Sequence, residues 1–334
     1  MKTEILKAGS ESLDKAAHLL KSGEVVAIPT ETVYGLAGNG LSAISVKKIF
    51  EAKGRPADNP LILHVADVNA LHEYAEEVPD LALKLAEKLW PGSLTMILKK
   101  KSSVPYETSG GLETVAFRMP DNAWTLELIR KCGFPLAAPS ANLSGLPSPT
   151  CAEHVFSDMN GRIPLIVDAG SCSCGLESTV ITFTATGVKI LRPGAVTPEM
   201  LEKFCSVQID KAVTDGLDNS REALSPGMKY KHYSPKAQVC IVDCGSDEEF
   251  ISFVNVNSDD KTFVLFRADD RIKARVLPYG KTADDEAAEL FASLRKADDM
   301  GAEKIYVRSP DKKGIGLAVY NRLIRAAAFR VIKL

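Results

Sequence analysis

Two cationic side chains stand one residue apart where a predicted helix ends. Lys53 and Arg55 flank Gly54, and Pro56 disfavours any continuation of the helix. Ser42 suits the N-cap of this helix, because apolar residues at helical spacing follow it. A helix C-terminus tolerates cations through its dipole, so a charged helix end is the simplest interpretation. The pair becomes a candidate anion site because further polar groups follow short apolar runs later in the chain.

A hydroxyl-rich segment directly follows the first strand that the apolar pattern predicts. The strand covers 25–28, and Thr30, Thr32 and Tyr34 come after it. Open α/β sheets place ligands at the carboxyl ends of their strands, where such small donors would meet them. A hydrogen-bonded turn explains Pro29 and Thr30, but it explains Thr32 and Tyr34 less well.

A second polar segment follows the apolar residues 135–138 and is rich in small side chains. Ser140, Asn142, Ser144 and Ser148 supply hydroxyl or amide groups there, and their small neighbours let a ligand approach the backbone. No G-x-S-x-G sequence surrounds Ser140, so this serine is a poor candidate for a hydrolase nucleophile. The groups suit a phosphate ligand, although a Pro/Ser loop without a ligand fits equally well.

Two predicted strands carry one polar residue each among apolar neighbours. His64 follows the apolar run that starts at Leu61, and a lone histidine there is more often a satisfied core residue than a ligand contact. Arg118 alternates with apolar residues in the strand 114–120. This alternation points its side chain inward, where a guanidinium needs an anionic partner.

A glycine-rich sequence has to be weighed as a dinucleotide-binding motif. Gly38–Ala43 reads G-x-G-x-x-A and leads into a helix. We reject the motif because the nearest predicted strand ends about ten residues earlier and no acidic strand end follows. Neither Gly35 nor Gly40 is followed by Lys and Ser or Thr, so there is no Walker sequence either.

The composition is that of a chain large enough for two domains with buried cores. It has 334 residues, 45% of them hydrophobic and 25% charged, and a formal net charge of -2. Such a charge argues against a nucleic-acid coat protein, so any RNA binding needs a local basic patch. Neither a secretory signal nor the ~18 apolar residues of a membrane span is present, which predicts a soluble cytoplasmic protein without a membrane partner.

The seven cysteines are odd in number and widely spread, which favours reduced thiols. Cys151, His154, Cys172 and Cys174 could be imagined as a zinc set, but C-x-C is not the usual finger spacing. Cys151 and His154 would also lie within one helical turn. We therefore expect neither a tightly bound metal nor a redox pair at these positions.

The order of predicted elements divides the chain into three parts. Strands interleaved with helices in 1–204 predict an α/β or α+β sheet that encloses one cavity. Residues 238–334 predict a small parallel α/β domain, and 205–237 are expected to link the two. Within the link, Leu224–Lys236 carries three lysines, one histidine, two tyrosines and no acidic residue. That composition favours a lid over an anion or an RNA contact, with a plain linker as the simpler alternative.

Five segments in one order resemble the YrdC-type threonylcarbamoyl-AMP synthases. They are Pro29–Leu36, Lys53–Pro56, Ala138–Gly145, Glu177–Val180 and Leu191–Gly194. The strap at 225–235 and the second α/β domain resemble the longer, two-domain branch of this family. The resemblance implies a twisted open mixed-sheet catalytic domain with a large concave, electropositive cavity, followed by a small Rossmann-like α/β domain.

The resemblance also implies a reaction and its partners. L-threonine, bicarbonate and ATP, the last with Mg²⁺, would give L-threonylcarbamoyladenylate and pyrophosphate. The tRNA threonylcarbamoyl-transfer machinery would then use this intermediate to make N6-threonylcarbamoyladenosine beside the anticodon. A direct contact with tRNA or double-stranded RNA is compatible with this role.

Residue roles follow from the same resemblance. A cationic and polar tetrad matches the family's catalytic positions, and it consists of Lys53, Arg55, Ser140 and Asn142. The positions on the threonine side are matched by Thr32, His64, Arg118, Ala138 and Ser178. Those on the nucleotide side are matched by Arg55, Asn59, Thr114, Ser140, Ser148 and Arg192, with Tyr230 as the expected strap contact to ATP.

Three other functions stay open at this point. An RNA-binding protein without adenylating activity would use the Lys/Arg clusters and the strap, but the net charge of -2 and the inward-pointing Arg118 and His64 argue against it. A carbamoyl-adenylate-forming maturation enzyme is a nearer alternative, although the zinc-finger and acylphosphatase-like modules that accompany that role are missing from the sequence. A regulatory sensor would bind threonine and release no pyrophosphate.

Overall fold

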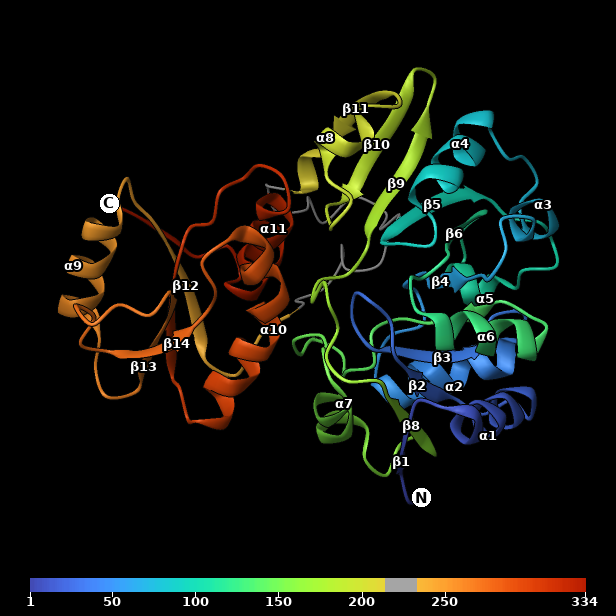
Figure 1. The fold of residues 1–334 in the computed structure, drawn as a ribbon, viewed down its shortest axis with the longest axis horizontal. Coiled ribbons are helices and arrows are strands. Elements are labelled where there is room, and N and C mark those ends of the chain that lie inside the picture. Colours follow the sequence, from blue (N-terminus) through green and yellow to red (C-terminus); the bar gives the residue numbers. More distant parts are fainter. Residues whose placement is uncertain (214–232) are drawn as a thin grey trace.

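The computed structural model describes residues 1–213 and 233–334, which form two α/β units side by side (Figure 1). The first unit is built on an eleven-stranded mixed sheet with the strand order β1-β8-β2-β3-β7-β4-β6-β5-β9-β10-β11. The second is built on a five-stranded parallel sheet with the order β14-β13-β15-β12-β16. The predicted fold class, a mixed open sheet followed by a small parallel α/β domain, is confirmed.

The elements of the first unit have the following bounds. Its strands are β1 (Glu4–Lys7), β2 (Val26–Ile28), β3 (Gly35–Asn39), β4 (Ile62–His64), β5 (Leu94–Lys99), β6 (Thr114–Arg118), β7 (Leu136–Ala137), β8 (Leu165–Asp168), β9 (Thr179–Thr184), β10 (Gly187–Arg192) and β11 (Ser206–Ile209). Its helices are α1 (Ser10–Lys21), α2 (Ala43–Lys53), α3 (Ala70–Tyr74), α4 (Asp80–Leu89), α5 (Tyr106–Ser109), α6 (Ala123–Cys132), α7 (Ala152–Met159), α8 (Pro198–Leu201) and the 3₁₀ turn η1 (Lys211–Val213).

The second unit covers its parallel sheet with helices on both faces. Its strands are β12 (Gln238–Asp243), β13 (Thr262–Phe266), β14 (Arg275–Pro278), β15 (Lys304–Arg308) and β16 (Val331–Lys333), and its helices are α9 (Asp247–Asn257), α10 (Ala283–Asp299) and α11 (Gly316–Ala326). Helices α10 and α11 pack on the face that is turned toward the first unit, whereas α9 packs on the opposite face (Figure 1). Val33 and Leu176 of the first unit belong to the core beneath α10 and α11, so the two units share apolar packing.

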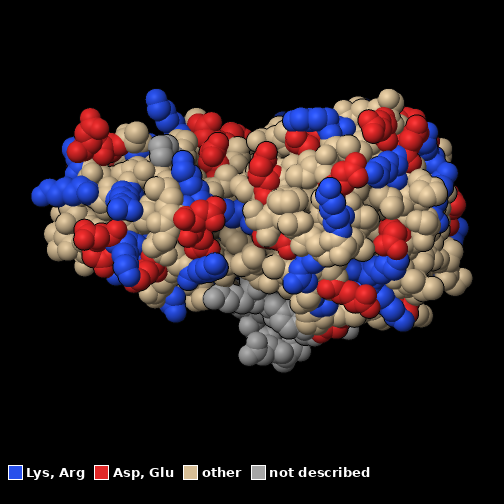
Figure 2. All heavy atoms as spheres, turned by 90° about the horizontal axis from the view of Figure 1, so that it is seen from below, with Lys and Arg blue, Asp and Glu red and all other residues tan. Residues whose placement is uncertain are grey.

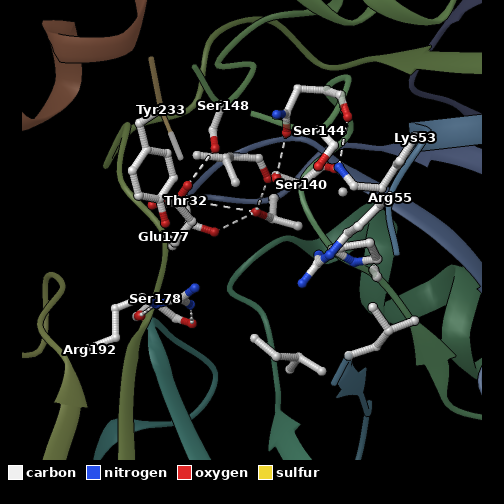
Figure 3. A pocket seen from close by; sticks show the side chains of 18 of the residues that line it. Thr32, Lys53, Arg55, Ser140, Ser144, Ser148, Glu177, Ser178, Arg192 and Tyr233 are labelled. Atoms are coloured by element: carbon white, nitrogen blue, oxygen red, sulfur yellow. Dashed lines mark hydrogen bonds between the residues drawn. The ribbon is translucent and has the colours of Figure 1, made fainter. Parts of the chain in front are cut away.

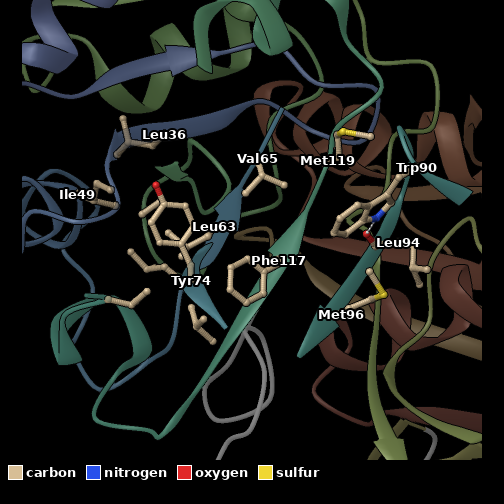
Figure 4. Close-up of a cluster of buried hydrophobic side chains, with 14 of the residues drawn as sticks. Leu36, Ile49, Leu63, Val65, Tyr74, Trp90, Leu94, Met96, Phe117 and Met119 are labelled. Atoms are coloured by element: carbon tan, nitrogen blue, oxygen red, sulfur yellow. Dashed lines mark hydrogen bonds between the residues drawn. The ribbon is translucent and has the colours of Figure 1, made fainter. Parts of the chain in front are cut away.

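The pleat of the large sheet separates a core face from a site face. Leu63 and Phe117, which are paired in register, point into the largest apolar core together with the other side chains of Figure 4. Their neighbours His64 and Arg118 point to the other face, because successive side chains of a strand alternate. On that face α1 and α6 cover β2 and β8, and their apolar side chains form a second core cluster. Over β4, β6, β5 and β9, no helix of the described chain covers this face, and a cavity lies there instead.

Three expectations from the sequence need correction. The strand β3 runs directly into the Gly38–Ala43 motif, so the stated distance from the nearest strand was wrong. Ser206–Ile209 pairs with β10 as β11, so the large sheet extends into the range that was expected to be a linker. The strands β1, β14 and β16 were not predicted, because each has only three or four residues.

Packing, not a ligand, accounts for the second glycine of the motif. A Cβ atom on Gly40 would lie 2.3 Å from Cδ2 of Leu63 and 2.9 Å from the carbonyl oxygen of Pro135. Gly40 therefore lets the chain pass close to β4 and to the segment before β7. None of the helices in 1–213 or 233–334 combines the length and apolar character needed to cross a bilayer.

We expect Gly40→Ala to lower the free energy of unfolding by about 1–3 kcal/mol, because the added methyl group overpacks the contact with Leu63. Urea unfolding of this variant and of Gly245→Ala measures the effect. Gly245 is a suitable control, since its nearest atom to a new Cβ is Oε2 of Glu249 at 3.4 Å. Equal stability of the two variants would contradict the packing role of Gly40.

Candidate functional site

A cavity of about 750 Å³, counted with its open mouth, lies over the uncovered face of the large sheet. Strand ends form its floor, and the loops 30–35 and 138–148 form much of its wall. The predicted site residues that line it are Thr32, Lys53, Arg55, His64, Arg118, Ala138, Ser140, Asn142, Ser148, Ser178 and Arg192. Lys53 and Arg55 enter from one side, and Ser178 and Arg192 lie on the opposite side (Figure 3).

Strand alternation and one bulge bring the polar groups of the floor together. Ser178 precedes β9, and its hydroxyl lies 2.7 Å from that of Thr95 on β5. The pairing of β9 with β10 shifts between Ile190 and Arg192, so Ile190 faces Ile181 whereas Arg192 faces Val180. This irregularity turns Arg192 to the cavity side, where regular alternation would have placed it with Ile190 in the core. Nε of Arg192 then donates to the carbonyl of Ser178 at 3.0 Å.

Lys53 holds the small-residue loop against the end of α2. Its Nζ donates to the carbonyl oxygens of Ser140 and Asn142, the latter at 2.7 Å, and its side chain is buried. Burial and the nearby charge of Arg55 lower the pKa of Lys53 well below its ordinary value. The left-handed Gly54 ends the helix directly after Lys53, as expected, and Ser42 caps its start. The loop itself is tied by a 2.6 Å hydrogen bond from Oγ of Ser140 to Oδ1 of Asn142.

Arg118 points inward as predicted, and its anionic partner is Glu31. Nη2 of Arg118 lies 2.7 Å from Oε1 of Glu31, and both side chains are largely buried. Burial alone would raise the pKa of Glu31, but the charge of Arg118 and the hydrogen bonds to it hold the pKa below its ordinary value. His64 pairs with Arg118 across the sheet and is buried. Burial and the charge of Arg118 lower the pKa of His64 to about 3, so this imidazole is neutral at physiological pH.

The carboxylate of Glu177 connects the cavity with the second unit. It accepts a hydrogen bond from the hydroxyl of Ser148, which lines the cavity beside it. Nε of Arg322, a fully buried residue of α11, donates to Oε2 of Glu177 at 2.7 Å, and Nη2 donates to its carbonyl at 3.1 Å. Burial would raise the pKa of Glu177, but the charges of Arg322 and Arg192 keep the pKa below its ordinary value.

A second buried ion pair joins the units behind the small-residue loop. Arg295 of α10 donates to both oxygens of Asp158 on α7, at 3.1 and 2.7 Å, and also to the carbonyl of Pro147. Asp158 in turn accepts from the backbone N–H of Leu143 at 3.2 Å. Close packing accompanies these bonds, since a Cβ atom on Gly175 would lie 2.5 Å from the carbonyl oxygen of Ala287 on α10.

Comparison with known proteins agrees with this architecture. The family model described as "Telomere recombination" matches residues 18–194, and the one described as "Threonylcarbamoyl-AMP synthase, C-terminal domain" matches residues 196–328. The chain belongs to the threonylcarbamoyl-AMP synthase family. It has the two-domain form of that family, as the resemblance in the sequence implied.

Relatives of similar length support this membership over nearly the whole chain. The threonylcarbamoyl-AMP synthase of Pyrococcus abyssi is 43% identical over 325 residues, with 95% of this chain and 94% of the relative covered. That of Bacillus subtilis is 43% identical over 345 residues, with 99% and 97% covered. The crystal structure of P. abyssi Sua5 complexed with L-threonine matches with a TM-score of 0.90 at 42% identity, covering 100% of this chain and 99% of that one.

Not every residue that the threonylcarbamoyl-AMP synthase resemblance pointed to lies in the cavity wall. Asn59, which lies before β4, and Thr114, the first residue of β6, are not among its lining residues. Tyr230 and most of the strap lie outside the described residues.

Sequence reasoning missed three groups that belong to this site. Glu177 was quoted within a motif without a role, and Tyr233 of the strap lines the cavity and packs against Phe291 at 5.3 Å between ring centroids. Arg322 lies behind the wall. In the sequence, only the position of this arginine within an apolar helix indicated that it could be buried.

We expect Arg322→Met to lower the free energy of unfolding by about 3–5 kcal/mol, because it leaves the buried Glu177 carboxylate without its cation. Chemical denaturation measures this loss, and Arg325→Met is the control, since Nη2 of Arg325 donates to the Ala212 carbonyl at 3.1 Å. The double variant Glu177→Gln/Arg322→Met should recover part of the loss, since no uncompensated charge remains. The ion pair would not be the main contact if Arg322→Met lost no more unfolding free energy than Arg325→Met and the double variant recovered none of it.

A pH prediction follows from the neutral His64. Its folded-state pKa of about 3 lies below the ordinary value of 6.5, so the unfolded chain binds the extra proton first. The resulting stability is fully present above about pH 6.5 and is lost as the pH falls toward 3, by at most about 1.4 kcal/mol per pH unit. His64→Gln should show a shallower fall of unfolding free energy between pH 6.5 and 4 than the wild type and the surface variant His72→Gln. Equal slopes would show that His64 is not buried in its neutral form.

Proposed function

We propose that the protein is an L-threonylcarbamoyladenylate synthase, which converts L-threonine, bicarbonate and ATP into L-threonylcarbamoyladenylate and pyrophosphate. The observation that carries the proposal is the convergence of phosphate-type and carboxylate-type binding groups in one cavity. Membership of the threonylcarbamoyl-AMP synthase family and the likeness to P. abyssi Sua5 complexed with L-threonine support it.

The reaction needs a cavity rather than a protein nucleophile. The amine of threonine and bicarbonate form an N-carboxylate with loss of water, and a carbamate oxygen attacks the α-phosphorus of ATP. The bond from this phosphorus to the bridging oxygen breaks, and pyrophosphate leaves with the electron pair. Three anionic species must therefore meet, so the main tasks are charge neutralisation, alignment and exclusion of water. We assign no protein nucleophile and no general base.

On the nucleotide side, we assign phosphate binding to Arg55 and Arg192, which approach from opposite sides of the cavity (Figure 3). A guanidinium matches phosphate oxygens in a two-pronged geometry. Ser148 would lie beside the nucleotide, with its single O–H donated to Glu177. Lys53 has a different role, because its ammonium group already donates to two backbone carbonyls of the loop. It would position Ser140 and Asn142.

On the threonine side, we assign the carboxylate to Arg118. A guanidinium carries five N–H groups, so the ion pair with Glu31 leaves donors for a substrate carboxylate. Thr32 and Ser178 would meet the hydroxyl and amine of threonine. The neutral His64 adds no repulsive charge there. Ala138 leaves room beside β7 for the amino-acid backbone.

Mg²⁺ would enter as part of the ATP substrate and neutralise part of its phosphate charge. The cavity carboxylate of Glu177 already accepts hydrogen bonds from Arg322 and Ser148, so it is a poor direct ligand for the metal. The product would pass to the tRNA threonylcarbamoyl-transfer machinery, and we expect the protein to act in the cytoplasm.

An RNA-binding protein would need a basic surface. On the face shown in Figure 2, Lys and Arg alternate with Asp and Glu over both units, and the described part of that face carries no broad basic field. With a net charge of -2, this distribution favours the small-molecule reaction over backbone recognition.

We expect Arg55→Met to slow adenylate formation, with a loss of about 2–5 kcal/mol of transition-state stabilisation. Lys53→Met should lose both activity and stability, because two loop carbonyls lose their donor. Lys47→Met, on the exposed side of α2, is the matched control. ATP–pyrophosphate exchange and thermal unfolding measure the two effects. Normal exchange by Arg55→Met would overturn its assignment.

The decisive experiment incubates pure protein with ATP, bicarbonate and labelled L-threonine and follows pyrophosphate and the adenylated product by mass spectrometry. Threonine-dependent pyrophosphate and threonylcarbamoyl-AMP without RNA are expected. RNA binding without pyrophosphate release would favour a binding protein, and threonine binding without turnover would favour a sensor. Product formation only with carbamoyl phosphate would favour the maturation-enzyme alternative.

A further inference from the structure

A second cavity, of about 550 Å³ with its open mouth, lies in the C-terminal unit and shares no lining residue with the first. It is bounded by the residues at and after the carboxyl ends of β13, β14 and β15. After β13 the chain continues to β14, at one edge of the sheet. After β15 it continues to β16, at the opposite edge. Adjacent parallel strands whose connections part in opposite directions form a crevice at their carboxyl ends, and open α/β sheets bind ligands there.

Two buried donors in this cavity find no acceptor among the described residues. Tyr279 is 3% exposed, and its hydroxyl makes no hydrogen bond. Nε of Arg308 is also buried without an acceptor, although its Nη1 lies 2.9 Å from Oδ1 of Asp247. A buried donor that lacks an acceptor is costly, so the cavity favours a ligand that brings acceptor oxygens.

The remaining lining includes the carboxyl side chains of Glu286 and Asp311, but its cationic side chains suit a small organic anion. Arg267 and Lys281 join Arg308, so cations come from the ends of three neighbouring strands. Asp247 pairs with both Arg267 and Arg308 from the start of α9, which fixes the two guanidinium groups beside the cavity. The apolar side chains of Leu265, Phe266 and Pro310 complete the wall and can cover a non-ionic part of the ligand.

We propose that this cavity binds a small phosphate-bearing ligand through Tyr279, Lys281 and Arg308. A phosphate group offers several acceptor oxygens at once, which matches the number of donors better than a carboxylate does. The site is independent of the adenylating cavity, so the C-terminal unit has a ligand of its own.

Glu286 supplies a pH dependence that tests the site. Burial raises its pKa to about 7, against the opposing charge of Arg308 from β15. The other groups around it are Asp285 on its own helix, Tyr279, and the cavity residues Arg267, Lys281 and Asp311. Below about pH 7 the carboxyl is neutral, and above it the carboxylate repels a phosphate. As the pH rises from 6 to 8, the phosphate itself gains negative charge in every variant. The wild type should therefore lose affinity relative to Glu286→Gln over this range, because only the wild type gains the Glu286 carboxylate.

The test titrates the full-length protein with AMP and with inorganic phosphate, by calorimetry and by thermal shift. Tyr279→Phe and Arg308→Met should each weaken one binding component by about tenfold or more and leave threonine-dependent pyrophosphate release unchanged. Arg55→Met should retain that component, and Arg271→Met, which changes an exposed arginine paired with Asp269, should behave as the wild type.

Tyr279→Phe should keep its thermal stability without AMP, since its hydroxyl has no partner to lose. AMP should raise the stability of this variant less than that of the wild type.

If Arg55→Met loses every binding component of the titration, the ligand binds only in the adenylating cavity. This result would overturn the proposal. So would unchanged affinity in both Tyr279→Phe and Arg308→Met. A component that is lost in Arg271→Met to the same degree would show non-specific attraction to the surface. Each of these results leaves the proposed synthase activity untouched, because that activity is measured separately.

Discussion

The buried carboxylate of Glu177 is the point on which both units of this protein depend. A carboxylate removed from water is stable only with a cation and hydrogen-bond donors around it, and here Arg322 comes from the far unit while Ser148 comes from the cavity wall. The C-terminal unit thus supplies the counter-charge for a residue next to the proposed threonine and nucleotide positions. The pair of Arg295 with Asp158 repeats this arrangement behind the small-residue loop. Two such contacts make the second unit a structural part of the cavity.

The cavity itself results from an incomplete covering of one sheet face. Helices α1 and α6 cover this face over β2 and β8 but not over β4, β6, β5 and β9. Alternation then presents His64, Arg118 and Thr95 to the open side, and the bulge in β10 adds Arg192. Since these side chains stand on paired strands, their spacing is set by backbone hydrogen bonds. Such rigidity suits a reaction whose barrier is lowered by alignment and charge neutralisation.

Local signals in the sequence predicted much of this arrangement. The end of α2 at Gly54, the inward direction of Arg118 and half of the cavity-lining residues could be predicted, because each depends on neighbours within a few positions or on a motif. The short strand β3 could not, because glycines carry no apolar alternation, and β11 was hidden by its exposed, weakly apolar residues. Asn59 and Thr114 match family positions, yet they are not among the residues that line the cavity.

The sequence by itself determined the fold class, the family and the residue types available for binding anions, since all three depend on periodicity and on motifs in fixed order. Only the tertiary structure decided what those residues contact. Lys53 turned out to hold a loop through two carbonyls, Arg118 to be paired with Glu31, and Glu177 to need an arginine 145 positions away. The reason is physical: burial makes each charge dependent on a partner, and partners distant in the sequence are brought together only by packing.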